Sequence, residues 1–289
     1  MTHLSKRLLF SKIISMIHVL YAGNDLMFDG LLLSTLSMAR RTKEDIHIHF
    51  MTMDFTHKNP KFKPFRRSQA DFLEKEIRKY NPNFKCSIID CTEEYNALLK
   101  DNANEKPVYS PYCTLRLLAD RYEELQGKLV YLDIDTMLYG DIKELYDIDM
   151  TDLEFRASHD YMGRVWIKRD YINSGILLLN MDVIRETKLL EKCRHLVKTK
   201  KMYFTDQTAL YKSKTKFKFF PNEYRFNEQR KVKPNTVVKH FCKGIKFPWI
   251  IIYNVKQWEI ERVQNYLKIH EFDEDFEIYK QIKSRQPNI

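Results

Sequence analysis

The sequence predicts an α/β fold in which strands alternate with helices around a buried sheet. Two observations carry this prediction. Short apolar runs recur along the chain, separated by stretches with helical periodicity. The 289 residues are 44% hydrophobic with only seven glycines and nine prolines, which suffices for a full core and disfavours a repeat or linker-rich architecture. No apolar run approaches the length of a membrane span, so we expect no transmembrane helix.

The first third of the chain sets the alternation. We expect a buried strand over residues 17–22, a turn at 23–25 and a helix over 28–40. Ile46, Ile48 and Phe50 recur with a period of two and predict the second strand. A helix over 66–80 and a strand over 86–90 follow. Strand, helix, strand, helix, strand is typical of a sheet with crossover connections.

The remainder continues the pattern. We predict a helix over 111–125, a strand over 129–132, an all-apolar strand from Gly175 covered on both faces, a helix over 181–200 and a short helix from Thr205, then strands at 217–220 and 236–240. Further on, four apolar residues recur at helical spacing: Phe272, Phe276, Tyr279 and Ile282. We expect this stripe to pack against the core, with docking on a membrane or partner as the alternative.

The fourth strand ends in Asp133-Ile134-Asp135. In an extended strand the two carboxylates point the same way with Cα atoms roughly 6.5 Å apart, so both reach one divalent cation. A metal at such a strand end is also where open α/β sheets bind phosphorylated ligands. Plain strand-end polarity or a turn is the alternative reading of an isolated Asp-x-Asp.

Charge and cysteine content narrow the setting. The formal net charge of +10 would attract nucleic acid, an acidic membrane surface or a phosphorylated substrate, although most lysines are also explained as a solvated surface. The five cysteines are odd in number and form no C-x-x-C pair, which disfavours a disulfide framework or zinc knuckle. We therefore expect a reduced, cytoplasmic setting.

Two chemistries use Asp-x-Asp after an apolar strand. Asp133-Ile-Asp135-Thr136 is similar to the nucleophile loop of haloacid-dehalogenase-like phosphatases, in which Asp133 would attack phosphorus. Those enzymes place the motif on their first strand and add a later acidic pair. Here the motif comes after an ordered α/β pattern without such a pair, so the phosphatase is the second choice. A non-catalytic basic binding module ranks third.

Several separated motifs favour the other chemistry. They are Leu20-Tyr-Ala-Gly23, Arg116, Tyr131-Leu-Asp-Ile-Asp135, Tyr171-Ile-Asn-Ser-Gly175 with Leu177-Leu-Leu-Asn180, Asp206-Gln207, and His240 with Gly244, Lys246, Pro248 and Trp249. In this order and spacing they resemble the retaining glycosyltransferases of family eight, the group of glycogenin and the bacterial galactosyl- and glucosyltransferases of surface glycans. The resemblance runs from about Ile17 to Trp249.

The resemblance implies a GT-A fold and a metal-dependent, retaining hexosyltransferase. The donor would be UDP-glucose or UDP-galactose, and the acceptor a glycan, lipid-linked or protein-linked. With the N-terminal residues and the change of composition past Trp249, we expect a leader (1–15), a catalytic domain (16–250) and a short helical C-terminal extension (251–289). The enzyme would be cytoplasmic, with peripheral contact to the inner face of the cell membrane and no nucleic-acid partner.

The resemblance also assigns roles to residues. Asp133, Asp135 and His240 would bind Mn²⁺, or Mg²⁺ in its place, and a divalent cation offsets charge on the leaving phosphate. The donor would contact Ala22, Asn24, Asp25, Arg116, Asp133, Ile134, Gly244 and Lys246. Asn173, Asp206 and Gln207 would face the sugar, with Asp160 on the acceptor side.

Three departures from the family pattern matter. Asn24-Asp25 stands where relatives have an Asp, Gly244 is displaced by one position, and Phe247 is inserted before Pro248, so Lys243 could share the role of Lys246. Gln207 is an amide and a poor nucleophile, whereas a covalent intermediate needs a carboxylate. We therefore expect attack by the acceptor on the same face as the leaving group, with Asp206 as a nucleophile the alternative.

Overall fold

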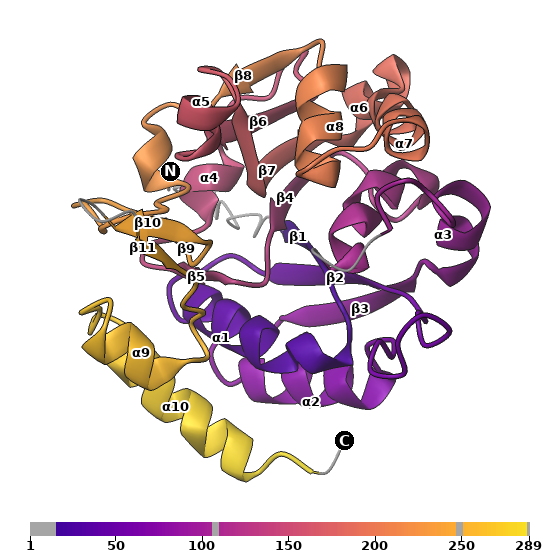
Figure 1. The fold of residues 1–289 in the computed structure, drawn as a ribbon. Coiled ribbons are helices and arrows are strands. Elements are labelled where there is room, and N and C mark those ends of the chain that lie inside the picture. The colour runs from indigo at the N-terminus through magenta and orange to yellow at the C-terminus, as the bar shows by residue number, and fades with distance from the viewer. Residues whose placement is uncertain (1–15, 106–109, 247–250, 288–289) are drawn as a thin grey trace, which may run out of the picture.

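The computed structural model describes residues 16–105, 110–246 and 251–287. Its centre is a seven-stranded sheet with helices on both faces (Figure 1). In spatial order the strands are β3 (Lys85–Asp90), β2 (Ile46–Thr52), β1 (Ile17–Ala22), β4 (Lys128–Leu132), β7 (Ile172–Asn180), β6 (Phe155–His159) and β8 (Phe217–Phe219).

The sheet is mixed. Strands β1, β2, β3 and β4 run parallel, and β7 runs antiparallel to both β4 and β6. The predicted strands are therefore confirmed, as is the α/β class. Residues 172–179 of β7 are all buried, as expected for a strand covered on both faces.

Two apolar layers cover the two faces. Val19 and Tyr21 of β1 point into one layer, and Leu20 and Ala22 point into the other, because side chains alternate along a strand. The first layer is covered by α1 (Phe28–Ala39), α2 (Arg67–Ile77) and α10 (Asp273–Ser284). The second is covered by α3 (Thr92–Leu98), the 3-10 helix η2 (Pro111–Arg121), α6 (Met181–Thr187), α7 (Leu189–Thr199) and α8 (Thr205–Ser213).

Two predicted helices differ in form. The segment predicted as a helix over 111–125 is a 3-10 helix that ends at Arg121; side chains of Thr114 and Arg116 bond to carbonyls three residues back, as its tight turns favour. The helix expected over 181–200 is broken at Lys188, whose φ of 55° is left-handed and ends α6 before α7 begins.

The C-terminal apolar stripe packs on the core. Phe272, Phe276, Tyr279 and Ile282 are buried, and α10 lies alongside α1 (Figure 1). Asp275 of α10 forms ion pairs with Arg40 at 2.6 Å and with Arg41 at 2.7 Å, and these stabilise the position of the helix. The packing prediction is confirmed.

Smaller elements complete the described chain, several of them not predicted. They are η1 (Asp25–Met27), β5 (Thr136–Leu138), α4 (Lys143–Tyr146), α5 (Gly163–Trp166), η3 (Glu223–Arg225), β9 (Val238–His240), β10 (Gly244–Lys246), β11 (Ile251–Tyr253) and α9 (Ile260–Asn265). The expected helical extension thus opens with a strand, which pairs with β10. The expected leader lies outside the described residues.

None of the described helices has the length and apolar character needed to cross a membrane. All five cysteines are free thiols.

Candidate active site

Asp133 and Asp135 lie in a turn, not on the strand. Strand β4 ends at Leu132, and the two aspartates fall in the connection to β5, where the Thr136 hydroxyl donates to the Asp133 carbonyl at 2.8 Å. The expected extended geometry is therefore wrong. The carboxylates still approach one place, because the turn redirects Asp135 toward a strand that arrives from far along the sequence.

That strand is β9. It pairs antiparallel with β5 so that His240 stands opposite Thr136, and the Phe241 amide donates to the Asp135 carbonyl at 2.7 Å. His240 Nε2 consequently lies 3.2 Å from Asp135 Oδ1 and 3.7 Å from Asp133 Oδ2. The three residues predicted to bind metal are brought together.

Each carboxylate has one oxygen anchored and the other directed at His240. Asp133 Oδ1 accepts from Arg116 Nη2 and from the Tyr131 hydroxyl, both at 2.8 Å. Asp135 Oδ2 is held by the Lys256 ammonium, which also donates to the Phe241 carbonyl at 3.0 Å. Burial by itself raises the pKa of Asp135, but Lys256 and His240 together hold it below its ordinary value.

The arrangement fits a divalent cation. One ligand atom from each of Asp133, Asp135 and His240 lies within 4.8 Å of the others. Gly175 makes the room, because a Cβ there would lie 2.2 Å from His240 Cε1 and 2.8 Å from Asp133 Oδ2. Two carboxylate oxygens and one imidazole nitrogen form a donor set that suits Mn²⁺ and tolerates Mg²⁺.

Arg116 links this cluster to a second one. It is 5% exposed, which rules out the solvent-facing arginine expected for a simple surface helix. Its Nε lies 3.3 Å from Asp206 Oδ2, its Nη1 donates to the Ser174 carbonyl, and its guanidinium carbon stands 3.9 Å over the Tyr131 ring. Burial opposes the charge, but Tyr131 and the neighbouring carboxylates raise the pKa of Arg116, which stays protonated.

Asp206 and Gln207 face the Asn173-Ser174-Gly175 segment from the start of α8. The Ser174 hydroxyl donates to Asp206 Oδ2 at 3.2 Å. Gln207 Oε1 accepts from the Ser174 amide at 3.1 Å and lies 3.3 Å from its hydroxyl. Both side chains are therefore held against β7, beside the arginine that binds Asp133.

The Asn173 side chain bonds to three neighbours. Its Nδ2 donates to Asp160 Oδ2 at 2.9 Å, and its Oδ1 accepts from the Gly175 amide at 3.0 Å and from Asn227 at 2.9 Å. In this arrangement Asn173 orients Asp160, which lies just past the end of β6.

The end of β1 carries buried acceptors without a partner. Ala22 closes the strand, and Asn24 Oδ1 and Asp25 Oδ1 are both buried without a hydrogen-bond partner among the described residues. The Ile134 side chain packs against this turn, because a Cβ at Gly23 would come 2.7 Å from Ile134 Cδ1. This turn therefore adjoins the Asp133-Asp135 turn.

Gly244 and Lys246 lie on β10. A Cβ at Gly244 would come 2.3 Å from the Tyr253 ring across the hairpin, which supplies a packing reason for the glycine. Lys246 pairs with Ile251 through its backbone. The Lys246 side chain, and the Phe247, Pro248 and Trp249 of the expected motif, lie outside the described structure.

With this geometry in place, comparison with known proteins identifies the family. The sequence model of "Glycosyl transferase family 8" matches residues 18–253. The chain belongs to this family. A relative from Haemophilus influenzae is 27% identical over 155 residues, which is 46% of this chain and 47% of that protein. The glycosyltransferase GlyA of Streptococcus pneumoniae is 27% identical over 120 residues, 41% of this chain and 16% of that protein.

Solved structures support the fold. The galactosyltransferase LgtC, crystallised with donor and acceptor sugar analogs, superposes with a TM-score of 0.65 at 17% identity, covering 94% of this chain and 98% of that one. The glycosyltransferase GlyE of Streptococcus pneumoniae gives 0.61 at 16% identity, covering 94% and 64%. The predicted GT-A fold and the predicted family are confirmed, and the family-8 match lends no support to the phosphatase alternative. The chain spans less than half the length of the curated relatives it matches.

Several residues of this family-8 site were not predicted. Lys256 binds Asp135, and the side chain of Gln257 donates to the Ile134 carbonyl at 2.6 Å, so this later segment of the chain holds the Asp133–Asp135 turn in place. Tyr131, Ser174 and Gly175 stood within the recognised motifs but without an assigned contact. Sequence spacing could not reveal Lys256 or Gln257, because no local pattern distinguishes them from surface residues.

Proposed function

We propose that this protein is a metal-dependent retaining glycosyltransferase that moves glucose or galactose from a UDP-sugar to a glycan, lipid-linked or protein-linked acceptor. One observation carries the proposal. In this family-8 chain the side chains of Asp133, Asp135 and His240 lie together. One oxygen of each carboxylate faces the imidazole, and the side chains of Arg116 and Lys256 bind the other oxygens.

These three residues would hold the cation. We favour Mn²⁺, with Mg²⁺ as the alternative, and when bound it would supply Lewis-acid stabilisation of the diphosphate leaving group. Asp133 and Asp135 keep their coordinating oxygens oriented because Arg116, Tyr131 and Lys256 fix the opposite oxygens.

The donor's nucleoside would lie at the end of β1. Asn24 Oδ1 and Asp25 Oδ1 are buried acceptors that lack partners in the described chain, and a uracil imide N–H or ribose hydroxyls would satisfy them. Ala22 and Ile134 would line this place with backbone and apolar surface. Gly244 and Lys246, with Lys243, would approach the diphosphate, where a lysine adds positive charge.

The sugar would lie between the metal ligands and the start of α8. Asp206 would accept hydrogen bonds from sugar hydroxyls, since the carboxylate is oriented by Arg116 and Ser174. The ion pair with Arg116 also makes Asp206 a weak nucleophile, which favours same-face attack by the acceptor. Gln207 would stabilise the oxocarbenium-like state as a dipole fixed by Ser174, and the leaving phosphate would take the proton.

The acceptor would enter beside Asp160. Asn173 orients Asp160 and also contacts Asn227, which lines a surface hollow of about 100 Å³ between the end of β6 and residues 223–233. Aromatic and charged side chains in the hollow, Tyr161 and Arg230 among them, suit a polar sugar. We further propose a cytoplasmic setting with the basic surface near an anionic membrane.

The test is release of UDP from a panel of nucleotide sugars, with Mn²⁺, Mg²⁺ or EDTA. We expect turnover with UDP-glucose or UDP-galactose that EDTA abolishes and Mn²⁺ restores. Absence of both UDP binding and turnover under every condition would contradict the proposal. Product anomers analysed by NMR would show retention, and a trapped glycosyl adduct on Asp206 would overturn the same-face step.

A further inference from the structure

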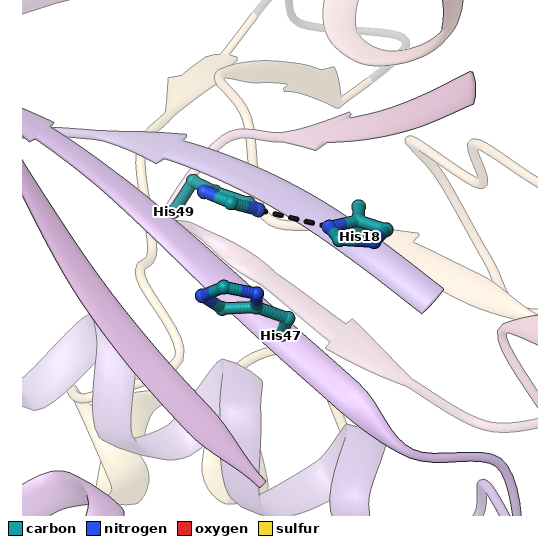
Figure 2. Close-up of side chains that lie close together, drawn as sticks. All are labelled: His18, His47 and His49. Carbon is teal, nitrogen blue, oxygen red and sulfur yellow. Dashed lines mark hydrogen bonds between the residues drawn. The ribbon is translucent and has the colours of Figure 1, made fainter. Parts of the chain in front are cut away.

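Three histidines gather at the opposite end of the sheet from the aspartates. His18 lies near the start of β1, and His47 and His49 lie on the adjacent β2, with rings facing one another on the sheet face that η2 covers (Figure 2). In the register of the two parallel strands, His18 pairs with His47. The three side chains therefore emerge on one face from two fixed strands.

The spacing of the ring nitrogens suits a shared ion. His18 Nδ1 and His49 Nε2 are 3.0 Å apart, and one nitrogen from each of the three residues lies within 4.8 Å of the others. Tetrahedral Zn²⁺ with bonds of about 2.0–2.1 Å holds its nitrogens roughly 3.3 Å apart. One pair already has nearly that separation, and the His47 ring, whose centroid lies 4.1 Å from that of His49 at an interplanar angle of 31°, would have to rotate to complete the set.

The hydrogen bonds of these rings leave nitrogen lone pairs available. His47 Nε2 lies 2.8 Å from the hydroxyl of Ser87, which lies on the adjacent strand β3. When Nε2 carries the proton, Nδ1 is free to act as a ligand, and the hydrogen bond to Ser87 orients the ring. His49 Nδ1 is buried without a partner in the described chain, so this ring is not held by a complete hydrogen-bond network.

We propose that His18, His47 and His49 form a second metal site, selective for an ion that prefers imidazole, Zn²⁺ first among them. Three neutral nitrogens favour Zn²⁺, Cu²⁺ or Ni²⁺ over Mg²⁺ or Mn²⁺, which prefer oxygen. His18 and His47 are only half-buried, which gives an ion access and leaves a position for water. The ion would cross-link β1 and β2 and thereby stabilise the sheet.

The proposal does not depend on the proposed function. The protein, stripped of metal with a chelator, is titrated with Zn²⁺ while bound metal is counted by elemental analysis and Tm is recorded. Because an ion that binds only the folded state stabilises it, saturating Zn²⁺ should raise Tm by about 5 °C. His18→Gln and His47→Gln should each lose one equivalent of Zn²⁺ and that rise.

His270→Gln is the matched control. His270 is exposed and bonds to Asp273, so its loss should leave the zinc equivalent and the rise in Tm unchanged. UDP release with Mn²⁺ should stay the same in His18→Gln, which separates this site from the catalytic one. Equal Zn²⁺ content in wild type and both cluster variants would overturn the proposal and leave the rings a packing role.

A second measurement uses the wild-type protein and therefore does not require that the variants fold. Co²⁺ absorbs visible light strongly in a tetrahedral nitrogen site, so its absorption spectrum reports the geometry of its ligands. We expect one equivalent of Co²⁺ to develop this absorption and one equivalent of Zn²⁺ to remove it. A spectrum of octahedral Co²⁺ alone would contradict the site.

Discussion

The two ends of the central sheet each bring three potential metal ligands within 4.8 Å, and they differ in charge. Beyond the carboxyl end of β4, two carboxylates and His240 converge, and Arg116 and Lys256 bind the carboxylates. Near the amino ends of β1 and β2, three imidazoles converge, and their contacts are with one another and with Ser87. Carboxylates kept close together need cations within the fold, whereas neutral rings do not.

The difference also separates the ions that the two ends would accept. Oxygen ligands with compensating cations suit a hard ion that binds together with a diphosphate, as in the proposed transfer. Nitrogen ligands suit a borderline ion that remains with the protein. The following substitutions test this contrast, beginning with the largest expected effect.

Gly175→Ala should disrupt the cluster of Asp133, Asp135 and His240 and leave the histidine cluster intact. The new Cβ would lie 2.2 Å from His240 Cε1, so His240 must move and the ligand set opens. We expect kcat/KM for UDP release to fall by about 10³, or about 4 kcal/mol of transition-state stabilisation. The zinc-dependent rise in Tm should persist. Gly140→Ala, where the nearest atom is 3.4 Å away, is the control, and wild-type activity in Gly175→Ala would refute the steric argument.

Arg116→Lys should test the link between the two acidic groups. Lysine keeps the charge but cannot bind Asp133, Asp206 and the Ser174 carbonyl together. We expect kcat/KM to drop about 10²-fold and unfolding free energy to fall by about 2–4 kcal/mol, measured by steady-state kinetics and urea denaturation. Arg67→Lys, in an exposed pair with Asp71, should change neither; a similar loss there would remove the specificity of the result.

Lys256→Met should make the fold depend on metal. Without the ammonium, Asp135 and Asp133 repel each other in the metal-free protein, so Tm should fall by about 5 °C, and added Mn²⁺ should raise it more than in wild type. Lys280→Met removes the exposed pair with Glu277 and serves as the control. An unchanged response to Mn²⁺ in the Lys256 variant would show that the ammonium does not compensate these carboxylates.

Ser87→Ala should affect only the histidine cluster near the amino ends of β1 and β2. Loss of the hydroxyl beside His47 Nε2 removes the contact that orients the ring, and we expect zinc affinity to weaken by about tenfold. Isothermal titration calorimetry measures the change. Ser284→Ala on the exposed end of α10 is the control, and UDP release should be the same in both. Identical zinc affinities would exclude a role for Ser87.

The sequence supports prediction of the fold well, because each strand and helix carries its own local signal. The strand from Ile17 and the helix from Phe28 have clear apolar patterns, and the structure contains both. The prediction of one continuous helix from Met181 to Lys200 was wrong at Lys188. The left-handed conformation of this lysine cannot be predicted from the spacing of the apolar residues. The hairpin of β10 and β11 is too short to show a period.

The predicted site depends on long-range pairing and was found only through recognised motifs. Asp133, Asp135 and His240 lie together as the family resemblance implied, but the extended-strand geometry expected for the two aspartates was wrong, since the turn and the β5–β9 ladder bring the three residues together. Lys256 carries no motif and could not be predicted. The roles of Asn173, Asp206 and Gln207 toward a substrate stay predictions until a donor is bound.

The β5–β9 ladder also sets the order in which the two ends can form. Strands β1 and β2 are close in sequence, so the histidine cluster can assemble once the early part of the chain has left the ribosome. His240 and Lys256 follow Asp135 by a long stretch of sequence, and the entropy of closing so long a loop delays their contacts with Asp135. Until those later residues have been synthesised, Asp135 lacks the side chains that hold its carboxylate, whereas Arg116 and Tyr131 precede Asp133 and are already available to bind it.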